Sequence, residues 1–503
     1  MSKYLLGIDN GGTVTKAALY TIEGKEVAVS SKKTKMLMPQ PGHTERDIEG
    51  LWQANVTVIK DVLHQSQIDP SLIEGIAITG HGNGLYLVDK DGNPTYNGII
   101  STDTRAKKYI DEWYKDERFL SEVLPKTMQS MWAGQPVALL AWLKEHHPDA
   151  VNNAEWIFMV KDLIRYRLTG EAYSEITDMS GTNLLNVKDK KYDEELLHFF
   201  GIRDVFQKLP PLKSSTDICG YVTKEAAHET GLQEGTPIAG GIFDIAASAI
   251  ATGLIEENKL CIVAGTWSIN EYITKKPVID KELFMTSIYC ASDYWLTTEA
   301  SPTSASNLEW FINQFLEGEK SIAKSRGISI YDLCNEMVAD TKPEESDVIF
   351  FPFLFGSNTV ANATSCFIGL NNWHEKKHLL RAVYEGIVFG HMYHIERLLQ
   401  YRDQPTACRI AGGVTNSDVW LQMFADCLQL PLEIVEVKEH GTLGTAMCAG
   451  VATKHFSSIE EAASKIVKIK QVIEPKPEQE EMYKKKYDRF KKIMKAMEHV
   501  WSI

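Results

Sequence analysis

The chain has 503 residues, of which 44% are hydrophobic and 24% are charged, as expected for a soluble globular protein with two or more domains. Its 53 basic and 67 acidic side chains give a formal net charge of −14, which excludes an extended nucleic-acid-binding face. No apolar run approaches the ~18–20 residues of a membrane span, and no signal or transit peptide opens the sequence. The eight cysteines include no Cys-x-x-Cys pair, so we expect reduced, buried thiols in a cytoplasmic protein.

The first predicted elements are two strands joined by a tight turn, "YLLGID", "NGGT" and "VTKAALYTI". The Asn-Gly-Gly run supplies the positive φ angles that hairpin turns need. Gly7 and Gly12, with Lys16 close behind, have the spacing of a phosphate-binding P-loop. Thr13 and Val14 stand where a P-loop has Lys and Ser/Thr, which excludes that motif.

The remaining segments of the first half carry clear patterns. They predict, in chain order, a buried strand over 73–80, a hairpin around Asp91-Gly92, a helix over 138–147 ending before Pro148, a helix over 157–169 closed by Gly170, and a strand followed by a small-residue helix over 236–253. We place the domain boundary near 251–258, with an N-terminal domain over 1–252 and a C-terminal domain over 253–503.

The second half opens on a hairpin of the same plan as the first, over 259–274, with an apolar strand, a Gly/Thr turn and an alternating strand. This repetition suggests a duplicated architecture. Further patterns predict a strand within "SDVIFFPFLFG", a helix over 378–400, a strand and turn in "CRIAGGVTNSDVWLQMFADCL", and a tail helix over 481–497 with Tyr483, Tyr487, Phe490, Met494 and Met497 on one face.

Each Gly/Thr hairpin could receive an anion, because backbone N–H groups and Thr hydroxyls converge at such turns. A pair of them, one in each domain, could hold a polyphosphate across a cleft. The residues concerned are Gly11, Gly12 and Thr13 in the first hairpin and Gly265, Thr266 and Ser268 in the second. Two ordinary hairpins with turn-forming glycines remain the alternative.

Asp9, at the end of its strand, could accept hydrogen bonds from waters on Mg²⁺, which keeps much of its hydration shell in proteins. Lys16 could offset the charge of a transferring phosphoryl group. Asp244 lies at a strand-to-helix junction, where a carboxylate could take a proton from an attacking hydroxyl; a helix cap is the alternative. Gly412 and Gly413 could let the backbone lie flat against adenine or ribose, although a plain strand–turn–helix gives the same pattern.

The stretch "HEKKH", from His374 to His378, matches the His-Glu-x-x-His pattern of zinc proteases. The sequence offers no convincing third ligand nearby, and the flanking residues indicate the start of a helix. We therefore reject a zinc site here.

Taken together, these motifs resemble those of the FGGY carbohydrate kinases over nearly the whole chain. The similar segments are "GIDNGGTVTK" and "AGTWS" (the two phosphate motifs), "GGIFDIAA" (the catalytic Asp), "AGGVTNSDVWLQMFAD" (adenosine) and "SCFIGLNNWHEKKHLLRAVYE" (the C-terminal signature). The resemblance implies an α/β fold of two duplicated ribonuclease-H-like (actin-like ATPase) domains around an interdomain cleft. It also implies ATP-dependent, Mg²⁺-requiring phosphorylation of a small sugar or polyol, with Asp244 as the base and Asp9 holding the metal through water.

The same resemblance implies which residues bind the substrates. For ATP they are Gly11, Gly12, Thr13, Lys16, Gly265, Thr266, Ala305, Glu309, Gly412, Gly413 and Asn416. For the sugar they are His81, Gly82, Asn83, Asp103 and Asp244. The N-terminal domain would then hold the sugar, the first phosphate hairpin and the catalytic Asp, and the C-terminal domain would hold the second hairpin and adenosine.

Three departures from the family pattern concern the sugar. Leu139 replaces a usual Lys, residues 101–105 replace the common Trp-Asn-Asp-x-Arg, and residues 81–84 replace the Gln-Met-His-Gly of D-xylulose kinases. The segments "GHGNGLYLVD", "STDTRA", "GTWSIN" and "EASPTSASNLEWF" are most similar to those of the L-xylulose (3-keto-L-gulonate) kinase branch. We expect a ketopentose such as L-xylulose. D-xylulose, ribulose, 3-keto-L-gulonate, erythritol, gluconate and a catalytically silent sugar and ATP sensor stay open, as does a homodimer.

Overall fold

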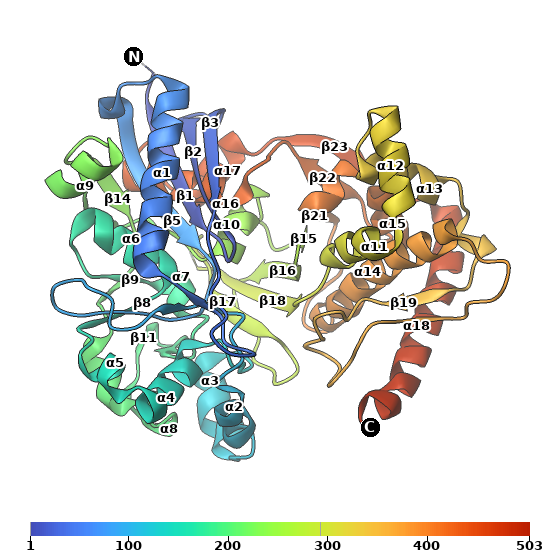
Figure 1. The fold of residues 1–503 in the computed structure, drawn as a ribbon, viewed down its shortest axis with the longest axis horizontal. Helices are drawn as coiled ribbons and strands as arrows, with labels where there is room; N and C mark the ends of the chain where they lie inside the picture. The colour runs from blue at the N-terminus through green and yellow to red at the C-terminus, as the bar shows by residue number, and fades with distance from the viewer. Residues whose placement is uncertain (1, 292) are drawn as a thin grey trace. The chain divides into compact units, whose positions relative to one another are not determined.

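The computed structural model describes residues 2–291 and 293–503 (Figure 1). The chain folds into two compact units, each assembled from separated stretches of sequence. Unit 1 comprises Met1–Ile255, Ile273–Leu296 and Val437–Val467, and unit 2 comprises Glu256–Tyr272, Thr297–Glu436 and Lys468–Ile503. Unit 1 therefore includes a segment, 437–467, that lies far along the chain from the rest of it.

Unit 1 is built on a six-stranded sheet in the order β13-β14-β5-β1-β2-β3. Its strands are β1 (Tyr4–Asn10), β2 (Val14–Thr21), β3 (Glu26–Lys33), β5 (Ile73–Gly80), β13 (Ile218–Tyr221) and β14 (Pro237–Ala239). The first three form an antiparallel meander, β5 runs parallel to β1, β14 runs parallel to β5, and β13 closes the edge antiparallel to β14. The predicted first hairpin and the buried strand over 73–80 are confirmed. The expected turn geometry is wrong, because Asn10, Gly11 and Gly12 do not adopt positive φ angles.

Four helices pack on this sheet or on each other: α1 (Ile48–Ser66), α6 (Val160–Thr169), α10 (Asp244–Ala251) and α16 (His440–Ala452). In Figure 1, α16 lies beside β1 and β5. Glycines allow this close approach, because a Cβ on Gly7 would lie 2.0 Å from the carbonyl oxygen of Thr442, and one on Gly444 would lie 2.3 Å from that of Ala247. The small residues of α16 thus bring its backbone against the strand that carries Asp9.

A second apolar core of unit 1 is formed by buried side chains between Leu85 and Leu209, together with Ile288. Small two-stranded sheets, β4–β7, β6–β8, β9–β12 and β10–β11, connect its helices. The further elements of unit 1 are β4 (Glu45–Arg46), η1 (Pro70–Leu72), β6 (Tyr86–Val88), β7 (Gly98–Ile99), α2 (Lys107–Trp113), η2 (Phe119–Val123), α3 (Leu124–Thr127), α4 (Pro136–His146), α5 (Pro148–Asn152), β8 (Trp156–Phe158), β9 (Ser174–Glu175), α7 (Ile176–Met179), β10 (Leu185–Asn186), β11 (Lys191–Tyr192), α8 (Glu194–Phe199), η3 (Arg203–Lys208), β12 (Leu212–Lys213), α9 (Lys224–Thr230), β17 (Met285–Ile288) and α17 (Ile459–Ile466).

Unit 2 repeats the plan with strands in the order β18-β16-β15-β21-β22-β23. These are β15 (Lys259–Ala264), β16 (Ser268–Thr274), β18 (Trp295–Ser301), β21 (Ala407–Ala411), β22 (Leu432–Val435) and β23 (Ile469–Ile473). As in unit 1, an antiparallel hairpin, β15–β16, comes first, and parallel strands β21 and β22 extend the sheet from β15. The duplicated α/β architecture expected from the two hairpins is confirmed.

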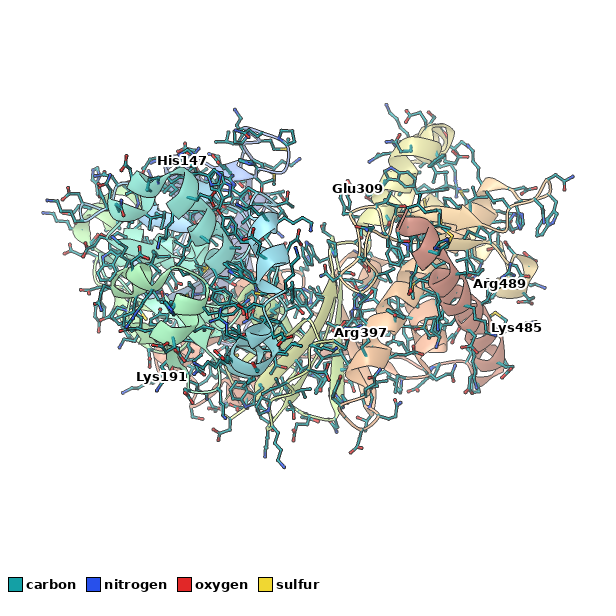
Figure 2. All side chains as sticks on the ribbon, turned by 90° about the horizontal axis from the view of Figure 1, so that it is seen from below. His147, Lys191, Glu309, Arg397, Lys485 and Arg489 are labelled. Carbon is teal, nitrogen blue, oxygen red and sulfur yellow. The ribbon has the colours of Figure 1, made fainter. Side chains whose placement is uncertain are left out.

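The helices of unit 2 surround α14 (Lys376–Leu398), which is buried along most of its length. The tail forms α18 (Glu480–Trp501), which buries Tyr483, Tyr487, Phe490 and Met494 as predicted, while Lys485 and Arg489 lie along its outer side (Figure 2). The other elements are α11 (Ser306–Phe315), α12 (Glu317–Arg326), α13 (Ile330–Ala339), η4 (Pro343–Glu345), β19 (Ile349–Phe351), β20 (Cys366–Ile368), η5 (Gly413–Asn416), α15 (Asp418–Leu428) and η6 (Pro477–Gln479).

The hairpin predicted around Asp91-Gly92 is confirmed, because the antiparallel bridges Leu85↔Ile99 and Val88↔Pro94 and the backbone hydrogen bond from Thr95 to Leu87 join its arms. Its strands also pair outward, β6 with β8 and β7 with β4. One predicted boundary needs correction. The helix predicted over 157–169 begins only at Val160, since the preceding residues form β8. Among the described residues, no helix combines the length and hydropathy needed to cross a bilayer.

Candidate active site

Asp9 stands next to the turn of the first hairpin, opposite Lys16 in the register of β1 and β2. The N-terminus of α16 lies against it, since a Cβ on Gly441 would be 2.5 Å from the Asp9 Oδ2 atom. Burial raises the pKa of Asp9 to about 6, and the positive charge of Lys16 opposes that rise. A helix N-terminus favours a neighbouring anion, so Asp9 and α16 together form an electrostatically matched pair.

Lys16 has an acidic partner from the same unit. Its Nζ atom lies 2.7 Å from the Oε2 atom of Glu439, the residue that precedes α16. Both side chains are partly exposed, at 34% and 26%. A phosphoryl oxygen that approached Lys16 would therefore have to compete with Glu439 for the ammonium group.

Asp244 is the first residue of α10, and its carboxylate accepts hydrogen bonds from the backbone N–H groups of Ile245, at 2.8 Å, and Gly82. A capping Asp accepts instead from N–H groups two or three residues further on, so these bonds differ from those of a helix cap. Burial, with the negative charge of Asp9 as the second cause, raises the pKa of Asp244 to about 7. Such a carboxyl group changes protonation state near neutral pH, as a general base requires.

The loop His81–Gly84 holds Asn83 close to this carboxylate. A Cβ on Gly82 would lie 1.9 Å from the ring of Phe243, so the loop can pack here only as glycine. Asn83 itself has φ +61° and is 3% exposed. Its Oδ1 atom has no hydrogen-bond partner among the described residues. A buried acceptor without a partner, one residue along the chain from the Gly82 N–H group that bonds Asp244, is suited to a substrate hydroxyl.

His81 connects the same loop to the first hairpin. Its backbone N–H donates to the carbonyl oxygen of Asn10, and its Nε2 atom lies 2.9 Å from the hydroxyl of Tyr86. Burial, and then the positive charge of Arg46, lower the pKa of His81 to about 3. His81 is therefore an uncharged hydrogen-bonding group at neutral pH.

Asp103 is buried and already has four donors. Its Oδ1 atom accepts from the backbone N–H and Nε of Arg105, and its Oδ2 atom accepts from Nη2 of Arg105 and the backbone N–H of Thr44. A carboxylate has about four acceptor positions. A sugar hydroxyl that contacts Asp103 would have to displace one of these donors.

Unit 1 also contains a buried charge cluster that none of the sequence motifs includes. The Nζ atom of Lys161 lies 2.8 Å from a carboxylate oxygen of Asp162, 3.5 Å from one of Glu175 and 3.6 Å from one of Asp178. All four side chains are fully buried, and burial raises the pKa of Asp178 well above its usual value, with Asp244 among the charges that act on it. A Lys-Asp pair inside the apolar run "IFMVKDLI" was the available signal.

In unit 2 the second hairpin is attached to the start of α11. The carbonyl oxygens of Gly265 and Thr266 accept from the backbone N–H groups of Ala305 and Ser304, both at 2.9 Å. Gly412, with φ +98°, lies against the end of β15, where a Cβ would be 2.4 Å from the carbonyl oxygen of Ala264. Four of the predicted nucleotide residues, Gly265, Thr266, Ala305 and Gly412, therefore come together within this unit.

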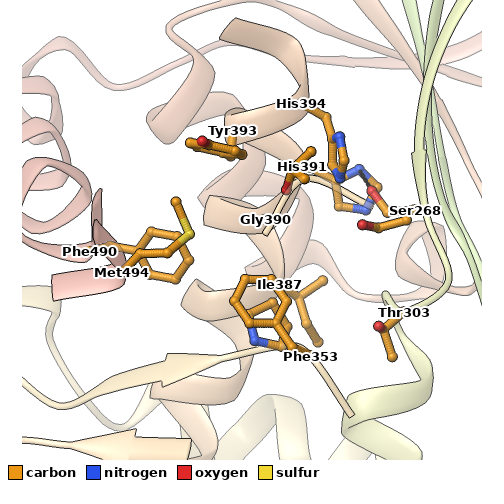
Figure 3. Close-up of a pocket in the computed structure, with 13 residues that line it drawn as sticks. Ser268, Thr303, Phe353, Ile387, Gly390, His391, Tyr393, His394, Phe490 and Met494 are labelled. Carbon is orange, nitrogen blue, oxygen red and sulfur yellow. Dashed lines mark hydrogen bonds between the residues drawn. The ribbon is translucent and has the colours of Figure 1, made fainter. Parts of the chain in front are cut away.

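His391 of α14 supports the second hairpin and was not anticipated (Figure 3). Its Nδ1 atom lies 3.0 Å from the hydroxyl of Ser268 and 2.8 Å from Oδ1 of Asn270, and its Nε2 atom lies 2.8 Å from the hydroxyl of Ser304. Burial lowers the pKa of His391 to about 3, so the ring stays neutral and links β16 to the segment before α11.

The other predicted nucleotide residues of unit 2, Glu309, Gly413 and Asn416, are exposed. Glu309 lies on the first turn of α11 (Figure 2). Gly413 and Asn416 occupy η5, with the Asn416 amide donating to the Gly413 carbonyl oxygen at 3.3 Å. Their exposure leaves these groups accessible to a ligand.

The rejected zinc motif has a different use in the structure. His374 and His378 accept, through Nδ1, the backbone N–H groups of Asn371 and Glu375, and the second of these bonds caps α14. In the ranges that the structure describes, no group of three or more His, Cys, Asp or Glu side chains is arranged to hold a metal ion.

The comparisons with known proteins agree over the whole chain. The models of the FGGY family of carbohydrate kinases match residues 4–251 (N-terminal domain) and 260–453 (C-terminal domain). The chain is 37% identical to a probable L-xylulose kinase of Pasteurella multocida, covering 98% of this chain and 99% of that protein. It is also 37% identical to an L-xylulose/3-keto-L-gulonate kinase of Escherichia coli, covering 99% and 98%.

Among solved structures, a ligand-bound xylulose kinase of Lactobacillus acidophilus superposes with a TM-score of 0.89 at 26% identity, covering 98% of each chain. The fold is thus that of the two-domain, actin-like sugar kinases, as the motifs implied. Two matched domains, full-length relatives and a full-length structural match place the protein without ambiguity: the chain belongs to the FGGY family of carbohydrate kinases and is an enzyme of that class.

Proposed function

We propose that this carbohydrate kinase transfers a phosphoryl group from ATP to a hydroxyl of a ketopentose such as L-xylulose. The observation that carries the proposal is the juxtaposition of the Asp244 carboxylate with the loop His81–Gly84, where Asn83 keeps an open, buried acceptor. The names of the two relatives at 37% identity favour the same substrate.

In this proposal Asp244 takes the proton of the sugar hydroxyl as its oxygen attacks the γ-phosphorus, while Gly82 and Ile245 keep the carboxylate in place. Phosphoryl transfer leaves the protein mainly positioning and charge stabilisation to perform. Asn83, His81 and Asp103 orient the sugar. With a carboxyl group whose pKa lies near 7, proton removal is accessible at neutral pH.

Asp9 is the residue we assign to the divalent metal, which we take to be Mg²⁺. Its carboxylate accepts no hydrogen bond from any described residue and lies at the N-terminus of α16, so it is free to accept bonds from metal-bound water. When bound with ATP, the ion would supply positive charge to the phosphates.

The division of roles follows the two matched domains. We assign residues 1–252 to the sugar, the first phosphate hairpin (Gly11, Gly12, Thr13, Lys16) and catalysis. We assign residues 253–503 to the second phosphate hairpin (Gly265, Thr266) and to adenosine, with Ala305, Glu309, Gly412, Gly413 and Asn416. A cytoplasmic location and a homodimer stay predictions.

The proposal is tested by an ADP-release assay with Mg·ATP against L-xylulose, D-xylulose, L- and D-ribulose, 3-keto-L-gulonate, glycerol, erythritol and gluconate. We expect L-xylulose to exceed the other neutral sugars by about 100-fold in kcat/KM, equivalent to about 2.7 kcal/mol of transition-state discrimination. Binding of ATP and a sugar without turnover of any member would instead favour the sensor.

Replacement of Asn83 by Ala tests the sugar loop. Loss of one buried hydrogen bond to the substrate is worth about 1–2 kcal/mol, so we expect a roughly 5- to 30-fold rise in KM for the sugar. KM for ATP should change little. Asn93→Ala, in an exposed turn of the same unit, is the matched control. A sugar profile identical to that of the unchanged enzyme would place the sugar elsewhere.

The pH dependence of kcat/KM for the sugar tests the assigned base. Only the ionised form of Asp244 can accept a proton, and its pKa is raised to about 7, so activity should fall as pH decreases through that value. The ionised fraction is about a half at pH 7 and about a tenth at pH 6, and kcat/KM should follow it. A profile that is flat between about pH 5.5 and 8 would contradict the assignment.

A further inference from the structure

Arg46, on the short strand β4, is a buried arginine without an acidic partner. Only 1% of its surface is exposed. It forms no ion pair with a carboxylate of the described residues, and within that part of the chain its Nε and Nη1 atoms have no hydrogen-bond partner. Arg165 and Arg381 are also buried, but each pairs with a carboxylate, of Asp162 and Glu385 respectively.

An unpaired charge in this position opposes folding. A guanidinium cannot escape the penalty by losing its proton, because arginine stays protonated in proteins. Burial of a charge is tolerated where a counter-charge and hydrogen bonds are supplied. Since the described protein groups do not supply the counter-charge to Arg46, an anionic ligand is the group that would.

The guanidinium lies beside both predicted substrate regions. Its Nη2 atom donates to the carbonyl oxygens of Gly11, at 3.2 Å, and Gly12, in the turn of the first phosphate hairpin. Its positive charge also acts on His81, where it contributes to the lowered pKa of that residue. Arg46 therefore binds the turn expected to receive phosphate, and its charge reaches His81 in the loop expected to receive sugar.

We infer that Arg46 binds an oxyanion of the bound substrates through its unpartnered N–H groups. Guanidinium donors suit carboxylate and phosphate oxygens in geometry and charge. Two sources present this chemistry to a sugar kinase: the carboxylate of a sugar acid, and the phosphoryl group during transfer. The inference rests on the proposed function and adds a cationic residue that none of the phosphate or sugar motifs contains.

The test compares the unchanged enzyme with Arg46→Gln and Arg46→Lys. Arg203→Gln, which removes an exposed guanidinium from the same unit, is the matched control. For each protein, kcat and KM are measured with L-xylulose, a neutral ketose, and with 3-keto-L-gulonate, a sugar acid. Turnover by the unchanged enzyme tests the proposed function separately. If the unchanged enzyme turned over neither sugar, that result would count against the proposed function and not against the role of Arg46.

If Arg46 binds a carboxylate, Arg46→Gln raises KM for the acid about 30-fold and leaves KM for the neutral ketose nearly unchanged. If it binds the phosphoryl group, kcat falls about 100-fold with both substrates and both KM values stay similar. A merely structural brace would move neither quantity selectively. Unchanged kinetics, or parallel small losses accompanied by a lowered unfolding midpoint, would overturn the inference.

A ligand-binding measurement keeps the inference testable where Arg46→Gln fails to fold. The unfolding midpoint of the unchanged enzyme is recorded with millimolar L-gulonate, a non-reacting acid, and with inorganic phosphate, and the same is done for Arg46→Lys. We expect at least one anion to raise the midpoint of the unchanged enzyme and to do so less in the variant, which keeps the charge but loses the planar donor set. No shift with either anion would overturn the inference.

Discussion

Replacement of Asp244 by Asn should abolish most turnover while leaving ATP bound. The amide has nearly the shape of the carboxylate but cannot accept the proton of the sugar hydroxyl, and removal of a general base typically costs ~10²–10⁴-fold in rate. Asp244 is the first residue of α10, and its carboxylate accepts hydrogen bonds from backbone N–H groups, including those of Ile245 and Gly82. An amide oxygen can accept the same bonds, so the fold should tolerate the change. Single-turnover measurement of sugar phosphate formation gives the chemical step directly.

The control for this experiment is Asp116→Asn. Asp116 forms a solvent-accessible ion pair with Arg118 in the same unit. It should retain kcat within a factor of about two. Binding of ATP to Asp244→Asn, measured by calorimetry, should match that of the unchanged enzyme. Activity near that of the unchanged enzyme in Asp244→Asn would remove the carboxylate from its proposed role.

Local patterns were sufficient for those parts of the fold and site that lie together in sequence. The hairpin of β1 and β2 could be predicted from two apolar strands around a short Gly-rich turn, although Gly11 and Gly12 do not have the positive φ angles expected there. The position of Asp244 could be predicted from a strand that ends just before a small-residue helix. The same holds for the second hairpin and for the apolar face of α18. In each case the residues that determine the local structure are close to one another in sequence.

Features that depend on distant segments were not predictable in this way. Helix α16 is not among the elements predicted from the sequence, yet its Gly441 lies against Asp9, more than 400 positions away, and Glu439 binds Lys16. His391 reaches the second phosphate hairpin from the middle of α14. Nothing in the local sequence of these residues distinguishes them from other buried or exposed side chains, because their partners are chosen by packing.

The burial of Arg46 could not be predicted from its local sequence either. In the sequence "HTERDIEG" it looks like one of several surface charges before a helix. Pairing of β4 with β7 places it opposite Gly98 and removes it from solvent. Only the three-dimensional arrangement reveals that it has lost its water without gaining an acidic partner.

Replacement of Lys161 by Met should lower the free energy of unfolding by about 3–5 kcal/mol, the usual cost of breaking a buried ion pair by removing one partner. Lys161 is fully buried and lies 2.8 Å from Asp162 and 3.5 Å from Glu175. Without the ammonium group, these carboxylates keep less compensating charge in a medium that solvates them poorly. Urea denaturation followed by tryptophan fluorescence measures the loss, provided the slope of the transition stays constant.

Two matched variants show whether charge burial is the cause. Lys107→Met breaks an exposed ion pair with Asp111, in which the Lys107 side chain is 70% accessible and the Asp111 side chain 52% accessible. It should change the free energy of unfolding by less than about 1 kcal/mol. Asp178→Asn should also cost little near neutral pH, since burial raises the pKa of Asp178 well above its usual value and the amide resembles the protonated acid. If Asp178→Asn lowered the free energy of unfolding as much as Lys161→Met, Asp178 would have to be ionised in the folded protein. The negative charge that acts on Asp244 would then be larger than a protonated Asp178 implies. If Lys161→Met cost less than about 1 kcal/mol, the buried charge cluster would not be a significant source of stability in unit 1.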